Sequence, residues 1–153
     1  MTRNQLILFA AAGSLALVLG AFAFQYVGGL APCVLCWYQR YPHMAAVVIG
    51  ALALAIPGRA LPILGALAAL TSAAIGVFHV GVEQKWWEGL ATCTVNTMEG
   101  LSGADLLNTN ITVGAPAACD KIAWAMWGLS MPAWNAILSL VLVGFWIAAA
   151  RRR

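Results

Sequence analysis

Charged residues are scarce in this sequence. Asp, Glu, Lys and Arg together make up 8% of its 153 residues, whereas a soluble domain has about 25%. Hydrophobic residues make up 63% of the chain, and they gather in long apolar runs. This composition excludes an ordinary soluble globular domain and indicates an integral membrane protein.

Recognisable sites for the common redox cofactors are missing as well. Covalent haem attachment requires a His directly after a C-x-x-C motif, and the residue after Cys36 is Trp37. Nothing in the chain resembles a flavin or nicotinamide site. A structural zinc site would need a second close pair of ligands, but Cys93 and Cys119 lie far apart in the sequence. We therefore predict no bound metal. Redox chemistry would depend on a cofactor that the protein binds from its surroundings.

Four apolar runs are candidates for membrane-spanning helices: 6–24, 41–56, 61–82 and 133–150. A helix needs about 20 residues to cross the hydrocarbon core, so the second run is short unless its helix begins upstream, near Cys33 or Tyr41. Pro42 would either kink a helix that begins at Cys33 or start a new one. We predict an all-α integral membrane protein, a four-helix transmembrane bundle that forms one membrane domain over residues 1–153.

The basic residues are unevenly distributed about these spans. Five of the eight lie on one side: Arg3, Arg59, Arg151, Arg152 and Arg153. The other three share the opposite side with all five acidic residues: Arg40, Lys85 and Lys121. Because Lys and Arg in short flanks stay in the cytoplasm, we predict cytoplasmic termini, a cytoplasmic turn at 57–60, and extracytoplasmic segments at 25–40 and 83–132. The net charge of +3 follows from this asymmetry and indicates no nucleic-acid partner.

Segment 83–132 is the only extramembrane stretch of any size in this arrangement. Charged residues, Asn, Thr and Gly interrupt the hydrophobicity there. Residues 98–107 are weakly amphipathic, so we predict a long extracytoplasmic loop with a candidate short helix lying on the bilayer surface. Gly100 and Gly103 oppose that helix, since each costs roughly 1 kcal/mol relative to Ala.

All four cysteines fall on the extracytoplasmic side, where disulfides form and persist. Cys33 and Cys36 make a C-x-x-C motif before the second span, and Cys93 and Cys119 lie in the long loop. Four cysteines allow three pairings, of which Cys33–Cys36 with Cys93–Cys119 is the simplest. One interpretation is a non-catalytic membrane assembly factor, in which a loop disulfide contributes about 3 to 4 kcal/mol. A C-x-x-C bridge closes too small a loop to stabilise much, which favours thiol exchange.

Polar residues with helical spacing accompany the C-x-x-C motif. In a helix that begins at Cys33, the residues Cys36, Arg40 and His43 share one face. Arg40 would stabilise a Cys36 thiolate, and Arg40 and His43 could donate hydrogen bonds to a small polar head group. A quinone has such a head group and an apolar tail that dissolves in the bilayer. Three more candidate contacts lie at the outer end of the third span: His79, Glu83 and Gln84.

Taken together, these motifs resemble the DsbB (disulfide bond formation protein B) family. The similarity covers four spans, Cys33-Val34-Leu35-Cys36 after the first span, and Arg40 four residues beyond it. It extends to Ala91-Thr92-Cys93 in the loop and to Met131-Pro132-Ala133-Trp134 at the last helix. In the vitamin K epoxide reductases the active C-x-x-C follows the loop cysteines, whereas here it precedes them.

The resemblance implies an enzyme of the bacterial inner membrane, a dithiol:quinone oxidoreductase that reoxidises a periplasmic DsbA-type thiol oxidase and reduces ubiquinone or menaquinone. It implies that the thiolate of this partner attacks Cys93, with Cys119 as the other member of the loop pair. It further implies that Cys33 relays electrons from the loop pair, that Cys36 as a thiolate faces the quinone, and that Arg40 contacts the quinone.

Two features depart from the family pattern. Gln39 stands where some members carry Glu. The family His near the end of the third span has no exact counterpart, which makes His79, Glu83 and Gln84 weaker candidates for quinone contacts than Arg40.

Overall fold

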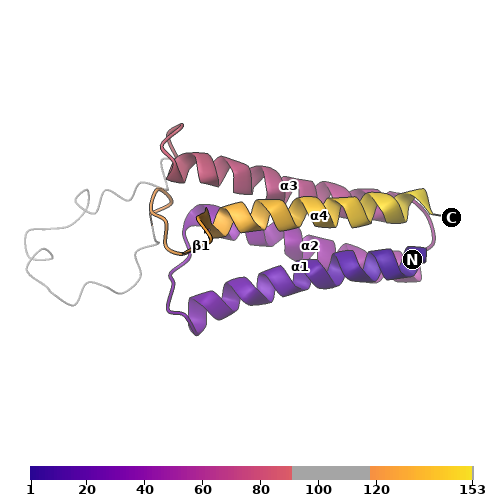
Figure 1. The fold of residues 1–153 in the computed structure, drawn as a ribbon. Helices are drawn as coiled ribbons and strands as arrows, with labels where there is room; N and C mark the ends of the chain where they lie inside the picture. Colours follow the sequence, from indigo (N-terminus) through magenta and orange to yellow (C-terminus); the bar gives the residue numbers. More distant parts are fainter. Residues whose placement is uncertain (91–117, 153) are drawn as a thin grey trace, which may run out of the picture.

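The structure, a computed structural model, describes residues 1–90 and 118–152. Within these ranges four helices run side by side (Figure 1): α1 (Arg3–Tyr26), α2 (Val34–Ala55), α3 (Ala60–Glu83) and α4 (Met131–Arg151). Helices α1 and α3 each pack on both α2 and α4. Both termini lie at one end of the bundle, and the end of α3 and the start of α4 lie at the other. The predicted helical bundle is therefore confirmed.

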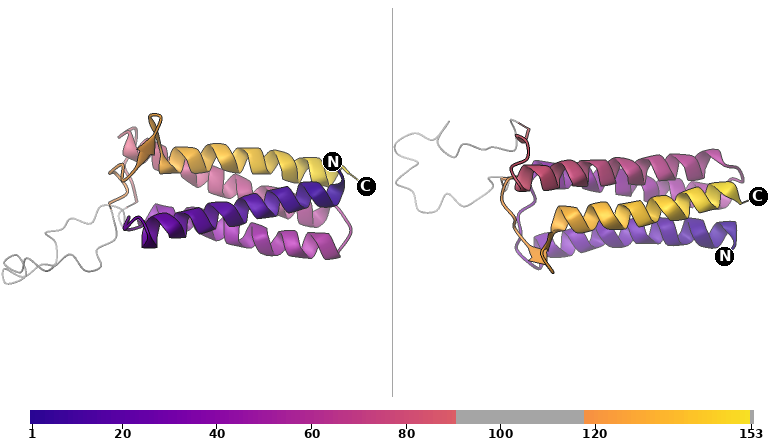
Figure 2. Two further views of the ribbon diagram at one scale, coloured as in Figure 1. Left: turned by 60° about the horizontal axis from the view of Figure 1, so that its bottom comes forward. Right: turned by 45° about the horizontal axis from the view of Figure 1, so that its top comes forward.

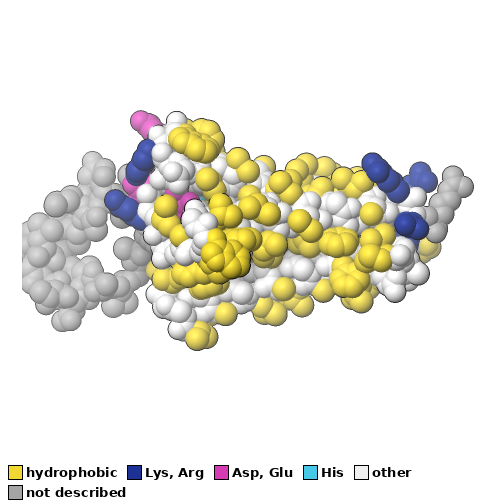
Figure 3. Space-filling view, in the orientation of Figure 1, with side chains coloured by type: hydrophobic (Ala, Val, Ile, Leu, Met, Phe, Trp, Pro, Cys, Tyr) yellow, Lys and Arg dark blue, Asp and Glu magenta, His cyan; other side chains and the backbone are white. Residues whose placement is uncertain are grey.

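Three of the helices, α1, α3 and α4, are long and apolar enough to cross a membrane. Large side chains on their outer faces are exposed, such as Leu8 and Leu19 on α1 and Leu64 on α3. Figure 3 shows this apolar surface between two ends that carry Lys and Arg side chains. Helix α2 contains the polar residues Gln39 and Arg40, and both are buried inside the bundle. The polar residues of α2 therefore face other helices.

Helix α2 begins further upstream than its apolar run. The run starts at residue 41, whereas the helix starts at Val34, so residues 34–40 of the expected extracytoplasmic segment 25–40 are helical. Cys33 caps the helix, because its Sγ atom accepts a hydrogen bond from the backbone N–H of Cys36 at 3.2 Å. Pro42 lies inside α2, where its ring removes one backbone donor without ending the helix.

A short hairpin precedes α4, which the prediction of an all-α fold did not include (Figure 2). Strand β1 (Ala125–Met126) pairs antiparallel with β2 (Leu129–Ser130). Trp127 and Gly128 between the strands have positive φ angles of 52° and 78°, as in a two-residue type I′ turn. The candidate surface helix at 98–107 lies outside the described residues.

Apolar and small side chains form the core of the bundle near the termini. Trp146 of α4 is completely buried there. We call the buried side chains around it the Trp146 core: Leu6, Ile7, Ala10, Ala46, Ala53, Ala66, Ala69, Leu142, Trp146 and Ala149. A methyl group added at Gly65 of α3 would lie 2.6 Å from the Trp146 ring. Glycine at this position therefore allows α3 to approach α4 closely.

Candidate active site

The C-x-x-C pair lies at the N-terminus of α2. Cys33 is the N-cap, Cys36 lies in the first turn, and their Sγ atoms are 2.7 Å apart. Both are thiols in this structure; Cys33 is buried and Cys36 is partly exposed. The partial positive charge at a helix N-terminus favours a thiolate, so this position suits thiol exchange.

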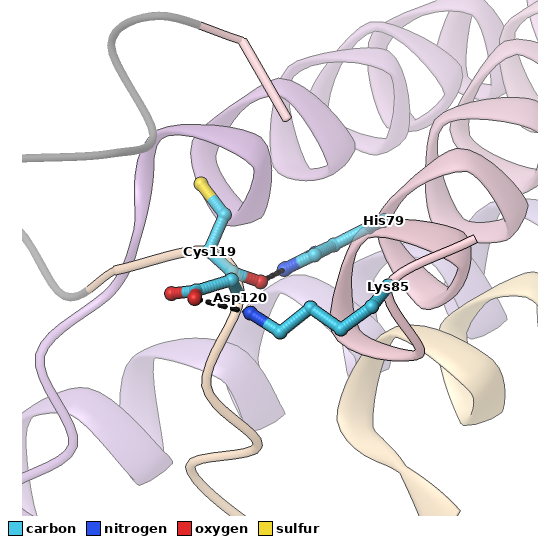
Figure 4. Close-up of polar contacts among 4 residues, drawn as sticks. All are labelled: His79, Lys85, Cys119 and Asp120. Atoms are coloured by element: carbon cyan, nitrogen blue, oxygen red, sulfur yellow. Dashed lines mark hydrogen bonds and ion pairs between the residues drawn. The ribbon is translucent and has the colours of Figure 1, made fainter. Parts of the chain in front are cut away.

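Cys119 lies against the C-x-x-C pair. It is 1% exposed and belongs to a buried cluster with three other residues: Cys33, Leu35 and Val82. The backbone carbonyl of Cys119 lies 3.2 Å from Nε2 of His79, and the same nitrogen lies 3.7 Å from the Sγ atom of Cys33. Figure 4 shows the Cys119 carbonyl facing the His79 ring. His79 therefore contacts both cysteine-bearing segments.

A second contact joins the Cys119 segment to the end of α3. The ammonium group of Lys85 donates a hydrogen bond to the carboxylate of Asp120 (Figure 4). This bond holds the pKa of the Asp120 carboxyl below its usual value. Exposed ion pairs contribute less than about 1 kcal/mol, so burial of Cys119 and its bond to His79 account for most of the attachment.

An apolar cavity of about 460 Å³ lies beside the cysteines. Phe24, Trp124 and Leu138 are among the aromatic and aliphatic side chains that form most of its wall. Six of the predicted site residues also line it: Cys33, Cys36, Arg40, His43, His79 and Glu83. Residues from α2 and α3 that are distant in sequence thus meet at one cavity.

Arg40 is held by α1. Its guanidinium donates hydrogen bonds to Gln25 Oε1 at 2.6 Å and to the carbonyl of Ala21 at 3.3 Å. It also lies over the rings of Phe22 and Trp37, 5.0 and 4.8 Å from their centroids, where cation–π attraction stabilises it. Unused N–H groups remain on the guanidinium for a ligand in the cavity. The only sequence signal for Gln25 was a polar residue at the end of an apolar run.

His43 lies deep in the bundle, at 2% exposure. Its Nδ1 atom lies 3.2 Å from Ser14 Oγ of α1. Its Nε2 atom lies 3.2 Å from Asn135 Oδ1 and 3.0 Å from Ser139 Oγ, both on α4. Both ring nitrogens therefore have partners within the protein.

Gln39 connects His43's partner on α4 to His79 on α3. Its Oε1 atom accepts a hydrogen bond from Asn135 Nδ2 at 2.8 Å, and its Nε2 atom lies 3.0 Å from Nδ1 of His79. Ser72 joins the same network, since its hydroxyl lies 3.1 Å from Asn135 Nδ2 and donates to the Gln39 carbonyl at 2.9 Å. We call the whole set the polar chain: Ser14, Gln39, His43, Ser72, His79, Asn135 and Ser139.

The other predicted site residues lie as follows. Glu83 is buried and accepts a hydrogen bond from the Ser130 hydroxyl. Gln84 caps the C-terminus of α3, is exposed, and is absent from the cavity lining as far as the structure describes it. Cys93 lies outside the described residues, so its pairing with Cys119 stays a prediction.

His79 adds a third donor beside the two thiols. The potential ligand atoms of Cys33, Cys36 and His79 all lie within 4.8 Å of one another. Local spacing does not predict a direct contact between His79 and the cysteines of the C-x-x-C motif, because they are on different helices. Two thiolates and an imidazole suit Zn²⁺ or Cu⁺. Whether this group binds a metal or exchanges thiols therefore depends on which ring nitrogen of His79 carries the proton.

The chain is similar to known proteins along most of its length. Residues 3–149 match the family model described as Disulfide bond formation protein DsbB. A Disulfide bond formation protein B of Methylococcus capsulatus is 35% identical over 136 residues, which cover 85% of this chain and 83% of that protein. Its namesake in Marinobacter nauticus is 29% identical over 158 residues, covering 97% and 90%. No solved structure matches the chain.

These matches confirm the resemblance seen in the sequence motifs. The family model spans all four helices and both ends of the segment that carries the loop cysteines. Its name identifies members as proteins that form disulfide bonds, in agreement with the clustered cysteines at the loop end of the bundle. The chain belongs to the DsbB family of membrane disulfide bond formation proteins.

Proposed function

We propose that this protein is a quinone-linked thiol oxidase, which reoxidises a periplasmic DsbA-type dithiol oxidase. The observation that carries the proposal is the position of Cys119, buried against Cys33 and next to the cavity that Cys33 and Cys36 line. A loop cysteine, a redox motif and an apolar cavity are thus neighbours, which is the arrangement that transfer from a soluble protein to a lipid-soluble acceptor requires.

The first exchanges conserve electrons at each step. A thiolate of the partner attacks Cys93 of a Cys93–Cys119 disulfide, so a mixed disulfide forms and Cys119 leaves as a thiolate. Cys119 then attacks Cys33 of a Cys33–Cys36 disulfide, forming Cys33–Cys119 and releasing Cys36 as a thiolate. The burial of Cys119 in one cluster with Cys33 supports this step.

The remaining exchanges return the loop to its starting state. The second thiolate of the partner attacks the mixed disulfide, which oxidises the partner and releases Cys93. Cys93 then attacks Cys119 and displaces Cys33. The Cys33–Cys36 pair now holds two electrons, and the charge of Arg40 and the helix N-terminus favour the thiolate of Cys36.

The residues around the cavity fit a quinone. The apolar wall suits an isoprenoid tail, and the volume lies in the range of small-molecule sites. Arg40 and Cys36 would hold the head group, because Arg40 keeps unused donors and Cys36 is the more exposed thiol. When bound, ubiquinone or menaquinone would accept two electrons and two protons. His43 would line the cavity without donating a hydrogen bond to the quinone, since both of its ring nitrogens have partners within the protein.

We further propose that all four helices cross the bacterial inner membrane, with both termini in the cytoplasm. The basic side chains at the end that carries the termini support this orientation, because Lys and Arg near short loops stay cytoplasmic (Figure 3). The cysteines of the described residues would then lie at the periplasmic side, where a soluble thiol oxidase can reach the loop.

Single-cysteine variants test the proposal. Stopped-flow mixing of the reduced DsbA-type partner with protein and ubiquinone should show quinone reduction by the wild type and none by Cys36→Ser. Cys93→Ala should prevent the mixed disulfide, whereas a mixed disulfide formed through Cys119 would reverse the loop assignment. Retained quinone reduction by Cys36→Ser would contradict the scheme.

The purified protein offers a second test. We expect bound quinone and a visible absorbance that disappears when the thiols are alkylated. Absence of both, with all four cysteines resistant to a mild reductant, would instead favour a non-catalytic membrane assembly factor with structural disulfides.

A further inference from the structure

The contacts of Gln39 fix the position of the proton on His79. The amide nitrogen of Gln39 donates to the carbonyl of Leu35 at 3.1 Å, and its oxygen accepts from Asn135 Nδ2 at 2.8 Å. Because one bond needs an amide donor and the other needs an amide acceptor, together they determine which side-chain atom of Gln39 is nitrogen and which is oxygen. Since an amide nitrogen only donates, Nδ1 of His79, 3.0 Å away, must accept. Neutral His79 then carries its proton on Nε2.

The protonated nitrogen of His79 faces the two cysteine segments. It lies 3.2 Å from the carbonyl oxygen of Cys119, which can only accept, and 3.7 Å from the Sγ atom of Cys33. The contact of Nδ1 with Gln39 and the contact of Nε2 with the Cys119 carbonyl therefore both require the proton on Nε2. His79 is 2% exposed, so water does not compete for these contacts.

The direction in which each hydrogen bond donates can be assigned for the rest of the polar chain in the same way. Asn135 donates through Nδ2, so its Oδ1 accepts from Nε2 of His43 at 3.2 Å. His43 Nδ1 must then accept the hydroxyl proton of Ser14 at 3.2 Å. Each residue of the series therefore donates to the next one, from Ser14 on α1 through α2 and α4 to His79 on α3. With this assignment every donor in the series meets an acceptor.

We propose that the polar chain fixes His79 as a hydrogen-bond donor to the Cys33 sulfur, stabilising Cys33 as a leaving thiolate in exchange with Cys119. This proposal rests on the proposed function and names the residues that assist one of its steps. His79 touches the reacting sulfur. Gln39, Asn135 and His43 are positioning residues, because they act through the orientation and tautomer of His79.

The assisted step is the one that returns electrons to the C-x-x-C pair. The Cys93 thiolate attacks Cys119 of the Cys33–Cys119 disulfide, so a Cys93–Cys119 bond forms and the Cys33–Cys119 bond breaks. The electron pair of the broken bond stays on Cys33 Sγ, which the N–H of His79 faces. No proton is transferred, and the total oxidation state of the sulfurs is unchanged. A hydrogen bond to an ionised group is stronger than one to a neutral group, so the contact stabilises the products of this step more than the disulfide.

The same geometry opposes metal binding by Cys33, Cys36 and His79. To ligate a metal, Nε2 must lose its proton, and neutral His79 would then carry the proton on Nδ1. That proton would point at the amide nitrogen of Gln39, which is also a donor. Metal ligands instead usually have an acceptor behind the imidazole. Gln39 therefore favours thiol exchange over a metal site.

Nitrogen-15 NMR of labelled histidine tests the tautomer directly. The chain contains only two histidines, and a His79→Asn variant assigns their signals. In the reduced protein in liposomes, we expect both to be neutral with the proton on Nε2. A proton on Nδ1 of His79 would overturn the proposal. So would loss of its N–H signal on adding one equivalent of Zn²⁺.

The alkylation rate of Cys33 tests the consequence for the sulfur. In a Cys36→Ser background, Asn135→Leu should lower the rate with iodoacetamide at pH 7 about tenfold, since His79 then loses its fixed orientation. Ser139→Ala is the matched control, because His43 keeps Asn135 as its acceptor. An unchanged His79 signal in Ser139→Ala shows that this variant keeps the tautomer of His79. Equal rates in the two variants would contradict the proposal.

These measurements separate the inference from the proposed function. Neither the NMR signal nor the alkylation rate requires quinone or partner. If quinone reduction occurs while His79 has the opposite tautomer, only the inference fails. If the tautomer is as expected but the protein does not reduce quinone, only the proposed function fails.

Discussion

The two ends of the bundle are held together in different ways. Near the termini, the Trp146 core consists of apolar and small side chains, and Trp146 Nε1 has no hydrogen-bond partner among the described residues. At the loop end, the polar chain links all four helices through buried hydrogen bonds, from Ser14 on α1 to His79 on α3. Buried polar groups are costly inside a membrane protein and usually mark function. We infer that the first region serves assembly and the second serves chemistry.

This contrast means that substitutions at the two ends should be detected by different measurements. A change in the Trp146 core alters how closely helices pack, so it should reduce stability before it affects quinone binding. A change at the cavity alters a ligand contact, so it should affect quinone binding with little loss of stability. Changes in the polar chain that leave a histidine nitrogen without its partner should affect both.

Arg40→Leu should have the largest effect. Loss of a charged hydrogen bond costs about 1.5 to 3 kcal/mol, so we expect the KM for quinone to rise about 10- to 100-fold. Steady-state quinone reduction measures this effect. Arg59→Leu is the control, because Arg59 is exposed at the opposite end of the bundle. An unchanged KM in Arg40→Leu would remove Arg40 from the site.

Gly65→Ala should come next, and it should affect stability alone. The added methyl group would lie 2.6 Å from Trp146, and such overpacking costs about 1 to 3 kcal/mol. Unfolding in mixed micelles measures the change. Gly144→Ala is the control, because a methyl group there meets nothing within 4 Å. Equal destabilisation by the two variants would show that the Trp146 contact is unimportant.

Ser14→Ala should have a smaller effect that appears in both measurements. It leaves Nδ1 of His43 without its partner at 3.2 Å, which costs about 1 kcal/mol of unfolding free energy. The rate of quinone reduction should also fall, because His43 is less well fixed. The control is Thr71→Ala, whose exposed hydroxyl bonds only within its own helix. A loss of stability without any loss of rate would separate Ser14 from the site.

Asp120→Asn should have the smallest effect. The pKa of Asp120 is lowered by Lys85, so the ion pair stabilises the fold above the usual carboxyl pKa of about 3.9 and its contribution is lost as the pH falls through the lower folded value. At pH 7 we expect less than about a fivefold faster alkylation of Cys119 in the variant. At a pH below both values, wild type and variant should react alike. Glu88→Gln, which changes an exposed carboxylate, is the control.

The sequence predicted the features that depend on local spacing. Apolar runs indicated the helices, and the C-x-x-C motif with Arg40 on the same face indicated a redox site beside a membrane. The start of α2 stayed open in the sequence, because Pro42 can lie inside a helix or begin one; the structure has the helix that begins at Cys33, its N-cap. The hairpin before α4 was missed because two-residue strands are too short to show a periodic pattern.

Contacts between helices could not be predicted from one sequence. Gln39 and Asn135 are bonded across 96 positions, and nothing in their local surroundings indicates the partner. The proximity of Cys119 to Cys33 likewise depends on how the loop returns to α3. Polar residues inside an apolar run were the available signal for the polar chain, but such residues indicate only that a partner exists.

Cys33 also connects chemistry to helix formation. Its sulfur accepts the hydrogen bond that satisfies the backbone N–H of Cys36 at the start of α2. A thiolate is a stronger acceptor than a disulfide sulfur, so the first turn of α2 should tighten when an exchange releases Cys33 as a thiolate and loosen when Cys33 is bound in a disulfide. The amide proton of Cys36 would then exchange with solvent at a rate that depends on the oxidation state of Cys33. Hydrogen exchange at this one backbone amide would report the redox state of the site.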